Sequence, residues 1–156
     1  MGLSSFDFAG TGAYRYLLVL LAAGGIGEVV LELLSWWVAP TVLGMAMRPD
    51  ILVSALAHVQ FGLEIPVKLA VSIHLALGLL GFPLLFALVR AVSGARSSVA
   101  PALVTGVALW AIAQAILAPL AGRPFMLGFG PYTWASLVVH VVYMLVVART
   151  VDVLRR

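Results

Sequence analysis

The sequence predicts an all-α membrane protein: an up-down-up-down bundle of four transmembrane helices with a short interfacial helix between the first two spans. Of its 156 residues, 63% are hydrophobic and only 10% are charged, whereas about 25% of the residues in a soluble domain are charged. Four apolar segments are long enough to cross a bilayer, and the connections between them are short. We therefore expect residues 1–156 to form a single transmembrane domain.

Each apolar segment reaches or exceeds the ~20 residues that a helix needs to cross a bilayer. The segments are residues 14–38, 66–92, 99–120 and 131–153. The short polar turn SGARSS joins the second to the third, so these two are expected to form an antiparallel hairpin. The first segment follows a start without a basic region, so it is predicted to be an uncleaved span and not a signal peptide.

The connection between the first two spans contains a further helix signal. Arg48-Pro49-Asp50 favours a helix start, and ILVSALAHVQFGL continues with an apolar stripe at helical spacing. A helix over residues 50–62 is too short to span, so we expect it to lie at the membrane surface. It carries His58, a secondary site candidate that we interpret as an interfacial residue. In the span after this helix, Pro83 predicts a kink.

The distribution of basic residues predicts the orientation. Six arginines lie at the helix ends on the side of the termini, and three basic residues lie on the other side. The two groups are Arg15, Arg90, Arg96, Arg149, Arg155 and Arg156, and Arg48, Lys68 and Arg123. The positive-inside rule then places both termini in the cytoplasm.

Composition and motifs argue against several classes of function. The absence of cysteine excludes disulfides, iron–sulfur clusters and thiol catalysis. No basic run or aromatic stacking platform indicates a nucleic-acid partner. No serine, histidine and acid set has the context of a nucleophile, and there is no phosphate loop, so catalytic residues are not predicted.

Polar residues inside the spans fall at one depth. Counted from the ends of the spans that face away from the termini, they lie roughly 9 to 15 Å deep at 1.5 Å per residue. These residues are Glu28, Glu32, His74, Gln114 and His140, with Tyr143 as a secondary member on the face of His140. An ionisable side chain inside a span indicates a functional site whose partner should be found nearby. The sequence therefore predicts one polar layer to which all four spans contribute.

This layer has several interpretations. Its members can satisfy one another as a structural hydrogen-bond network. Glu28, Glu32, His74 and His140 can also hold a transition metal, since carboxylate and imidazole suit iron, manganese, copper or zinc. The Glu-x-x-His signature of di-iron bundles is absent. A b-type haem between His74 and His140, which lie on diagonal helices, is a further alternative, although the two glutamates would crowd it. Proton relay or small-ligand binding also stays open.

The second half of the chain resembles the YagU-type family of small bacterial inner-membrane proteins. The stretches that carry the resemblance are SIHLALGLLGFPLLFALV, TGVALWAIAQAILAPLAG and WASLVVHVVYMLVVARTVDVLRR. His74, Gln114, Pro119 and His140 match the family pattern, whereas Glu28 and Glu32 match no position of it. The resemblance implies a four-span protein of the bacterial inner membrane and brings no assigned chemistry.

Two functions are compatible with these observations. The first is a non-enzymatic accessory or assembly subunit of a larger membrane complex, because the chain has few loops and long apolar helices with small-residue faces for docking. Its partners would be the bilayer and other membrane subunits or further copies of the chain. The alternative is a haem- or metal-binding protein, for electron transfer or ligand binding, that uses the polar layer.

Overall fold

The chain folds into four long antiparallel helical rods, which confirms the predicted fold class. The computed structural model describes residues 11–155, and no strand occurs among them. The first rod comprises α1 (Thr11–Leu33), the π-helical turn η1 (Leu34–Val38) and α2 (Ala39–Leu43). The other three are α4 (Val67–Ala76), η2 (Leu77–Gly81) and α5 (Phe82–Ser93); α6 (Val99–Ala111), η3 (Ile112–Leu117) and α7 (Ala118–Leu120); and α8 (Pro131–Leu154).

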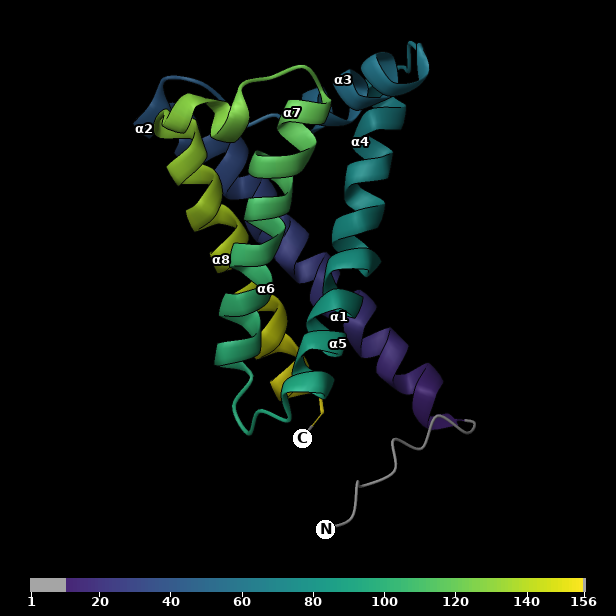
Figure 1. The fold of residues 1–156 in the computed structure, drawn as a ribbon. Coiled ribbons are helices and arrows are strands. Elements are labelled where there is room, and N and C mark those ends of the chain that lie inside the picture. The colour runs from purple at the N-terminus through teal and green to yellow at the C-terminus, as the bar shows by residue number, and fades with distance from the viewer. Residues whose placement is uncertain (1–10, 156) are drawn as a thin grey trace.

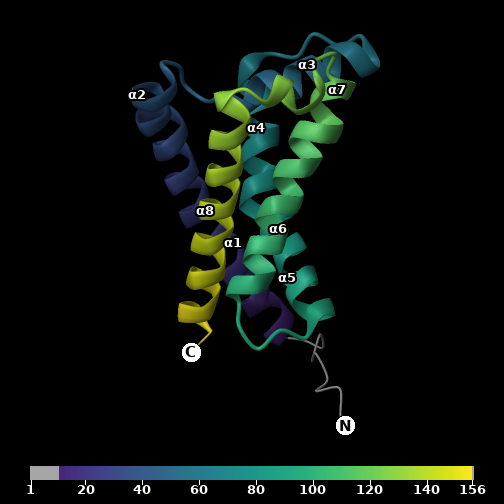
Figure 2. The ribbon, with the colours of Figure 1, turned by 60° about the vertical axis from the view of Figure 1, so that its left-hand side comes forward.

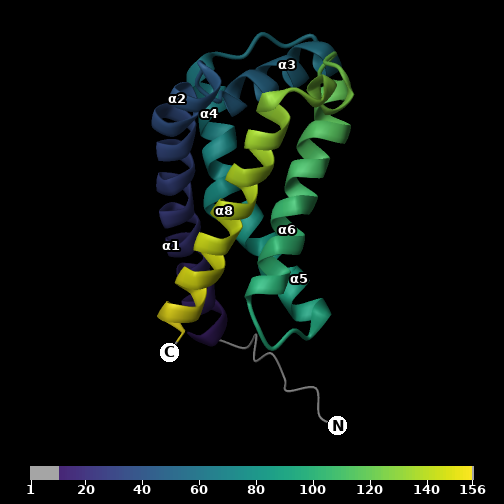
Figure 3. The same cartoon turned by 90° about the vertical axis from the view of Figure 1, so that its left-hand side faces the viewer.

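Each rod is long and apolar enough to cross a membrane. The rods run up and down in turn, and α1 crosses the bundle obliquely (Figure 1). The α5–α6 turn and the end of α8 lie at one end, and α2, α7 and the helix α3 (Pro49–Phe61) lie at the other (Figures 2 and 3). We call these the C-terminal end and the α3 end. The protein is a polytopic membrane protein.

Helix α3 closes one end of the bundle. It begins with Pro49 at its first position, which needs no backbone donor, and it ends at Gly62, whose φ of +67° is left-handed. Residues 50–62 were predicted for this helix, and it occupies Pro49–Phe61. The Gln60 side-chain amide donates a hydrogen bond of 2.6 Å to the Leu120 carbonyl. Helix α3 is therefore tied to the end of the third rod.

Prolines determine where π-helical turns interrupt the rods. Each of the three π-helical turns ends two residues before a proline, namely Pro40, Pro83 and Pro119. A proline lacks an N–H and its ring clashes with the carbonyl four residues earlier, and a wider turn relieves that clash. Because η1 accommodates Pro40, the first rod continues through this proline to Leu43, past the predicted end at residue 38. The kink expected at Pro83 takes the form of η2.

Two carbonyls in the π turns are bound from outside their own helix. The Met47 N–H donates to the Ser35 carbonyl in η1 over 3.1 Å. The Tyr143 hydroxyl of α8 donates to the Gly78 carbonyl in η2. A π turn interrupts the regular hydrogen-bond ladder, so these external donors stabilise it. Tyr143 thereby joins the fourth rod to the second.

The half of the bundle nearer the C-terminal end, which we call the C-terminal half, is a closely packed apolar core. Its apolar side chains are almost fully buried and come from all four rods. They are Leu20, Phe86, Ala102, Met144, Val147 and Val151. Beyond them, the Asp152 carboxylate accepts hydrogen bonds from Arg90 over 3.0 Å and from Ser98 over 2.6 Å. This polar cluster joins α5, α6 and α8 at the C-terminal end.

At Gly24, α1 packs directly against the backbone of η2. A Cβ there would lie 2.7 Å from the Leu79 carbonyl carbon and 2.8 Å from the Gly78 oxygen, both of them backbone atoms. A Cβ on the adjacent Gly25 would meet only a Leu79 methyl group at 3.7 Å. Contact between small residues lets two helices approach in a membrane, where no hydrophobic force drives them together.

We predict that Gly24→Ala lowers the free energy of unfolding by about 1–3 kcal/mol, the usual cost of overpacking. Gly25→Ala is the matched control and should be neutral or stabilising by up to about 1 kcal/mol, because alanine is the better helix former. Thermal unfolding of both variants in the same detergent measures the difference. Equal unfolding midpoints for the two variants would show that α1 and η2 are not in tight backbone contact at Gly24.

Candidate functional site

The contact between α1 and η2 places Glu28 inside the bundle. Glu28 lies one turn after Gly24 on the same face of α1, so the close approach at Gly24 carries its side chain against η2. There the carboxylate occupies the volume that a side chain on Gly78 would need, because a Cβ on Gly78 would overlap it. Glycine at position 78 therefore makes the room in which Glu28 is buried.

The Glu28 carboxylate is buried without a partner. The residue is 4% exposed, and neither carboxylate oxygen has a hydrogen-bond partner. Among residues 11–155, only four buried side-chain polar atoms lack a partner: both oxygens of Glu28, Nε2 of His74 and Oε1 of Gln114. Leaving a buried polar group unpaired costs about 1–3 kcal/mol, and more when the group is charged. All four atoms belong to the predicted polar layer.

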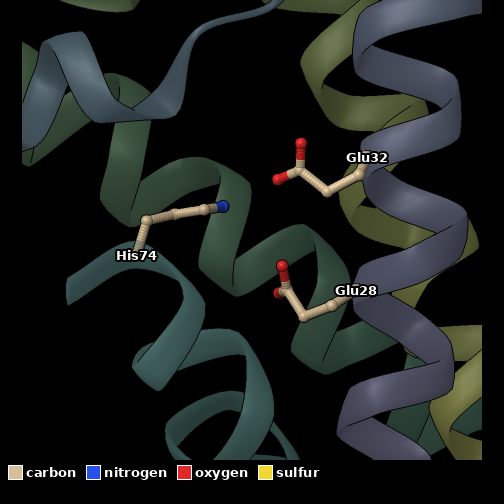
Figure 4. Close-up of side chains that lie close together, drawn as sticks. All are labelled: Glu28, Glu32 and His74. Atoms are coloured by element: carbon tan, nitrogen blue, oxygen red, sulfur yellow. The ribbon is translucent and has the colours of Figure 1, made fainter. Parts of the chain in front are cut away.

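Glu32 and His74 complete a cluster with Glu28. One donor atom from each of the three residues lies within 4.8 Å of the others. Figure 4 shows both carboxylates on α1, one turn apart, and the His74 ring reaching toward them from α4. Glu28 is buried, whereas Glu32 and His74 are half-buried. We call these three residues the Glu–His cluster.

Gln114 and His140 form a second polar group on the other two rods. The Gln114 amide donates to the Ser136 hydroxyl over 3.2 Å, and that hydroxyl lies 3.3 Å from Nδ1 of His140. The same Nδ1 lies 2.7 Å from the Ser136 carbonyl oxygen. A carbonyl can only accept, so Nδ1 carries the proton and Nε2 of the neutral ring keeps its lone pair. Gln114 Oε1 has no partner.

Tyr143 lies between the two groups of the layer. Its hydroxyl binds the Gly78 carbonyl next to Glu28, and its ring packs edge-on against Phe82 at a centroid distance of 6.1 Å. On the α1 side, a Cβ on Gly27 would lie 2.7 Å from the Tyr143 ring. The ring therefore fills the space between α1, η2 and α8, directly beside the Glu–His cluster.

His58 stands apart from the polar layer. Its Nδ1 lies 2.7 Å from Glu64, and both side chains are largely exposed. It belongs to α3 at the end of the bundle and is not part of the Glu–His cluster. The chain thus contains a second, exposed Glu and His pair that serves as a matched control for the buried one.

The five residues predicted to share a depth come together as two groups. Glu28, Glu32 and His74 face one another, and Gln114 and His140 are connected through Ser136. Reasoning from the sequence did not find the role of Gly78, which leaves room for Glu28. It also took Asp50 solely as a helix start, although Asp50 is buried. A carboxylate in the first helical turn beside an arginine was the signal available for it.

The three side chains of the Glu–His cluster are of types that bind metal ions in proteins. Two carboxylates and one imidazole are three ligands, and a catalytic or exchangeable zinc site commonly has three. Around an ion with ligand bonds of about 2.1 Å, tetrahedral donors lie about 3.4 Å apart. The three ligand atoms here lie within 4.8 Å of one another, so a shift of about 1 Å in the glutamate side chains would bring them to that spacing.

Comparison of the chain with protein-family models, curated proteins and solved structures finds no match.

We predict that Gly78→Ala is destabilising because the new methyl group displaces the Glu28 carboxylate from its buried position. In a background that carries Glu28→Ala, the same change should cost little, since the volume is free. A double-mutant cycle measured by thermal unfolding should give a coupling energy of about 1 kcal/mol or more. Additive effects of the two changes would contradict the direct contact.

Proposed function

We propose that this polytopic membrane protein binds a divalent transition-metal ion at Glu28, Glu32 and His74. The observation that carries the proposal is the Glu28 carboxylate, which is 4% exposed, has no partner on either oxygen and faces a second carboxylate and an imidazole nitrogen. Three of the four unpartnered atoms in the layer are oxygen acceptors. Within the Glu–His cluster, the two Glu28 oxygens and His74 Nε2 are all unpartnered, and carboxylate oxygens and an imidazole nitrogen can bind one cation together.

Charge supports a divalent ion over a monovalent one. Two ionised carboxylates beside one another in a low-dielectric interior repel, and burying either alone costs several kcal/mol. An ion of charge +2 neutralises both, and the neutral His74 ring adds a nitrogen donor. Imidazole suits zinc, iron, copper and nickel, whereas magnesium and calcium prefer sites made of oxygen alone. The ligand set therefore favours a transition metal.

The expected result of a metal titration is one Zn²⁺ or Co²⁺ ion bound per chain by the chelator-treated protein in detergent. Glu28→Gln and His74→Gln should each weaken binding by at least about 100-fold, because loss of outer-shell partners alone costs about 10–100-fold. Calorimetry or competition with a coloured chelator measures both quantities. His58→Gln and Glu64→Gln change the same residue types in the exposed pair and should leave the affinity unchanged.

Two outcomes would contradict the proposal. Binding that is equally strong in the four variants would place the ion elsewhere, and no binding would leave the layer as a network completed by water or by protons. Haem bands in a reduced-minus-oxidised spectrum of the purified protein would instead favour the alternative with His74 and His140 as axial ligands.

A second proposal concerns partners, and it is compatible with the first. The rod Val67–Ser93 is the least covered by the rest of the chain, since 17% of its most apolar window is buried against 33% for the other three. The uncovered side of this rod, which we call the docking surface, contacts lipid or a second membrane protein. We propose that this surface binds a larger membrane complex, of which the chain is an accessory or assembly subunit. The YagU-type resemblance supports a bacterial inner membrane, and the basic residues support cytoplasmic termini.

A fluorescent protein fused to the C-terminus tests both parts of this second proposal. The fusion should fluoresce in a bacterial host, because the reporter matures in the cytoplasm. Expressed at native level and extracted in a mild detergent, it should elute in size-exclusion chromatography as a complex larger than the fusion alone. A dark fusion would reverse the orientation, and a single small species would count against the accessory role.

A further inference from the structure

The Glu–His cluster is graded in exposure along the bundle. Glu28 is buried, whereas Glu32, one helical turn nearer the α3 end, and His74 are half-buried. Figure 4 shows Glu32 beyond Glu28 along α1, with the His74 side chain directed at the two carboxylates from α4. Contact with the surroundings is therefore made on the side of Glu32 and His74, and Glu28 is the deepest ligand.

The opposite side of Glu28 is sealed. The Tyr143 ring lies against α1, and its hydroxyl is bound to the Gly78 carbonyl. The apolar core of the C-terminal half, including Leu20 and Phe86, lies directly beyond it. Two buried hydroxyl residues lie in that half, and both are already bonded: Thr105 donates to the Pro101 carbonyl of its own helix, and Ser98 donates to Asp152. Between Tyr143 and the Asp152 cluster at the C-terminal end, an ion in the apolar core would lose its hydration without gaining ligands, which costs many kcal/mol.

A further buried carboxylate lies at the α3 end. Asp50 is 4% exposed and accepts hydrogen bonds from Nε and a terminal nitrogen of Arg48, over 3.0 and 2.5 Å. These bonds hold the pKa of the Asp50 carboxyl below its usual value, so it is ionised at neutral pH. Helix α3, which carries Asp50, packs against α4, which carries His74. The Arg48 side chain is 38% exposed and reaches toward the surroundings over the Trp36 ring.

We infer that the divalent ion reaches Glu28 from the α3 end alone, by way of Asp50, and that Arg48 competes with the incoming ion for the Asp50 carboxylate. The inference rests on the proposed metal site. It makes the site a dead end, because the tyrosine seal and the apolar core close the path toward the C-terminal end. A single copy of the chain then takes up and releases the ion at one face and does not pass it across the membrane.

Sided binding in vesicles tests the inference. The protein with a C-terminal affinity tag is reconstituted into liposomes, and capture on the tag separates vesicles with the tail outside from those with the tail inside. Each fraction is exposed briefly to radioactive Zn²⁺ and then to an external chelator at a temperature that keeps bound ion in place. Vesicles with the tail inside should bind the ion, and those with the tail outside should bind it only after detergent opens them.

Two substitutions at the α3 end have opposite expected effects. Asp50→Asn should slow Zn²⁺ uptake several-fold, because it removes the carboxylate on the path. Arg48→Gln should speed uptake, because it removes the competing cation. Glu64→Gln removes an exposed carboxylate from the same end and should change nothing. Damage to the fold would move the Asp50 and Arg48 variants in the same direction, so opposite signs separate the two explanations.

The outcomes distinguish this inference from the proposal beneath it. Stoichiometric binding in detergent together with equal uptake from both faces would overturn sided access and leave the metal site standing. Uptake from the tail side alone would reverse the path and overturn the inference as well. Absence of binding in detergent would overturn both. Parallel slowing in the Asp50 and Arg48 variants would remove Asp50 from the path.

Discussion

Burial of the Glu28 carboxylate is the constraint on which the rest of the structure depends. Gly24 brings α1 against the backbone of η2, and Gly78 leaves the volume that the carboxylate fills. Tyr143 then binds the Gly78 carbonyl and closes the space from α8. A buried carboxylate without partners is costly, so the arrangement makes sense when something else in the layer offsets that cost.

Much of the architecture could be predicted from the sequence, because a bilayer restricts a chain to few solutions. Segment length, the SGARSS turn and the Arg48-Pro49-Asp50 start were sufficient for four spans and the short helix. Counting residues along the spans also brought Glu28, Glu32 and His74 to one depth. Depth depends on the rise per residue, which is nearly constant in a helix.

The division of the layer into two groups could not be predicted in the same way. Which side chains face one another depends on helix rotation, and each π turn before a proline rotates the next helical segment of its rod. The close contact of Gly78 with Glu28 and the hydroxyl of Tyr143 on a π-turn carbonyl both arise from such a turn. The packing of α3, which carries Asp50, against α4, which carries His74, depends on how α3 folds back over the bundle, and no local pattern encodes that.

The proposed metal site and the proposed docking surface share the second rod. His74 lies in α4, directly before η2, and this rod is the least covered by its own chain. A partner packed on its outer face would press on the helix that carries a ligand and on the π turn that accommodates Glu28. Because a π turn and a regular helix differ in rotation, small shifts in this rod would move His74 relative to the two carboxylates. Binding of the ion would then shift α4 and change the surface that the partner contacts. In this way one small chain could serve as both a metal-binding protein and an accessory subunit.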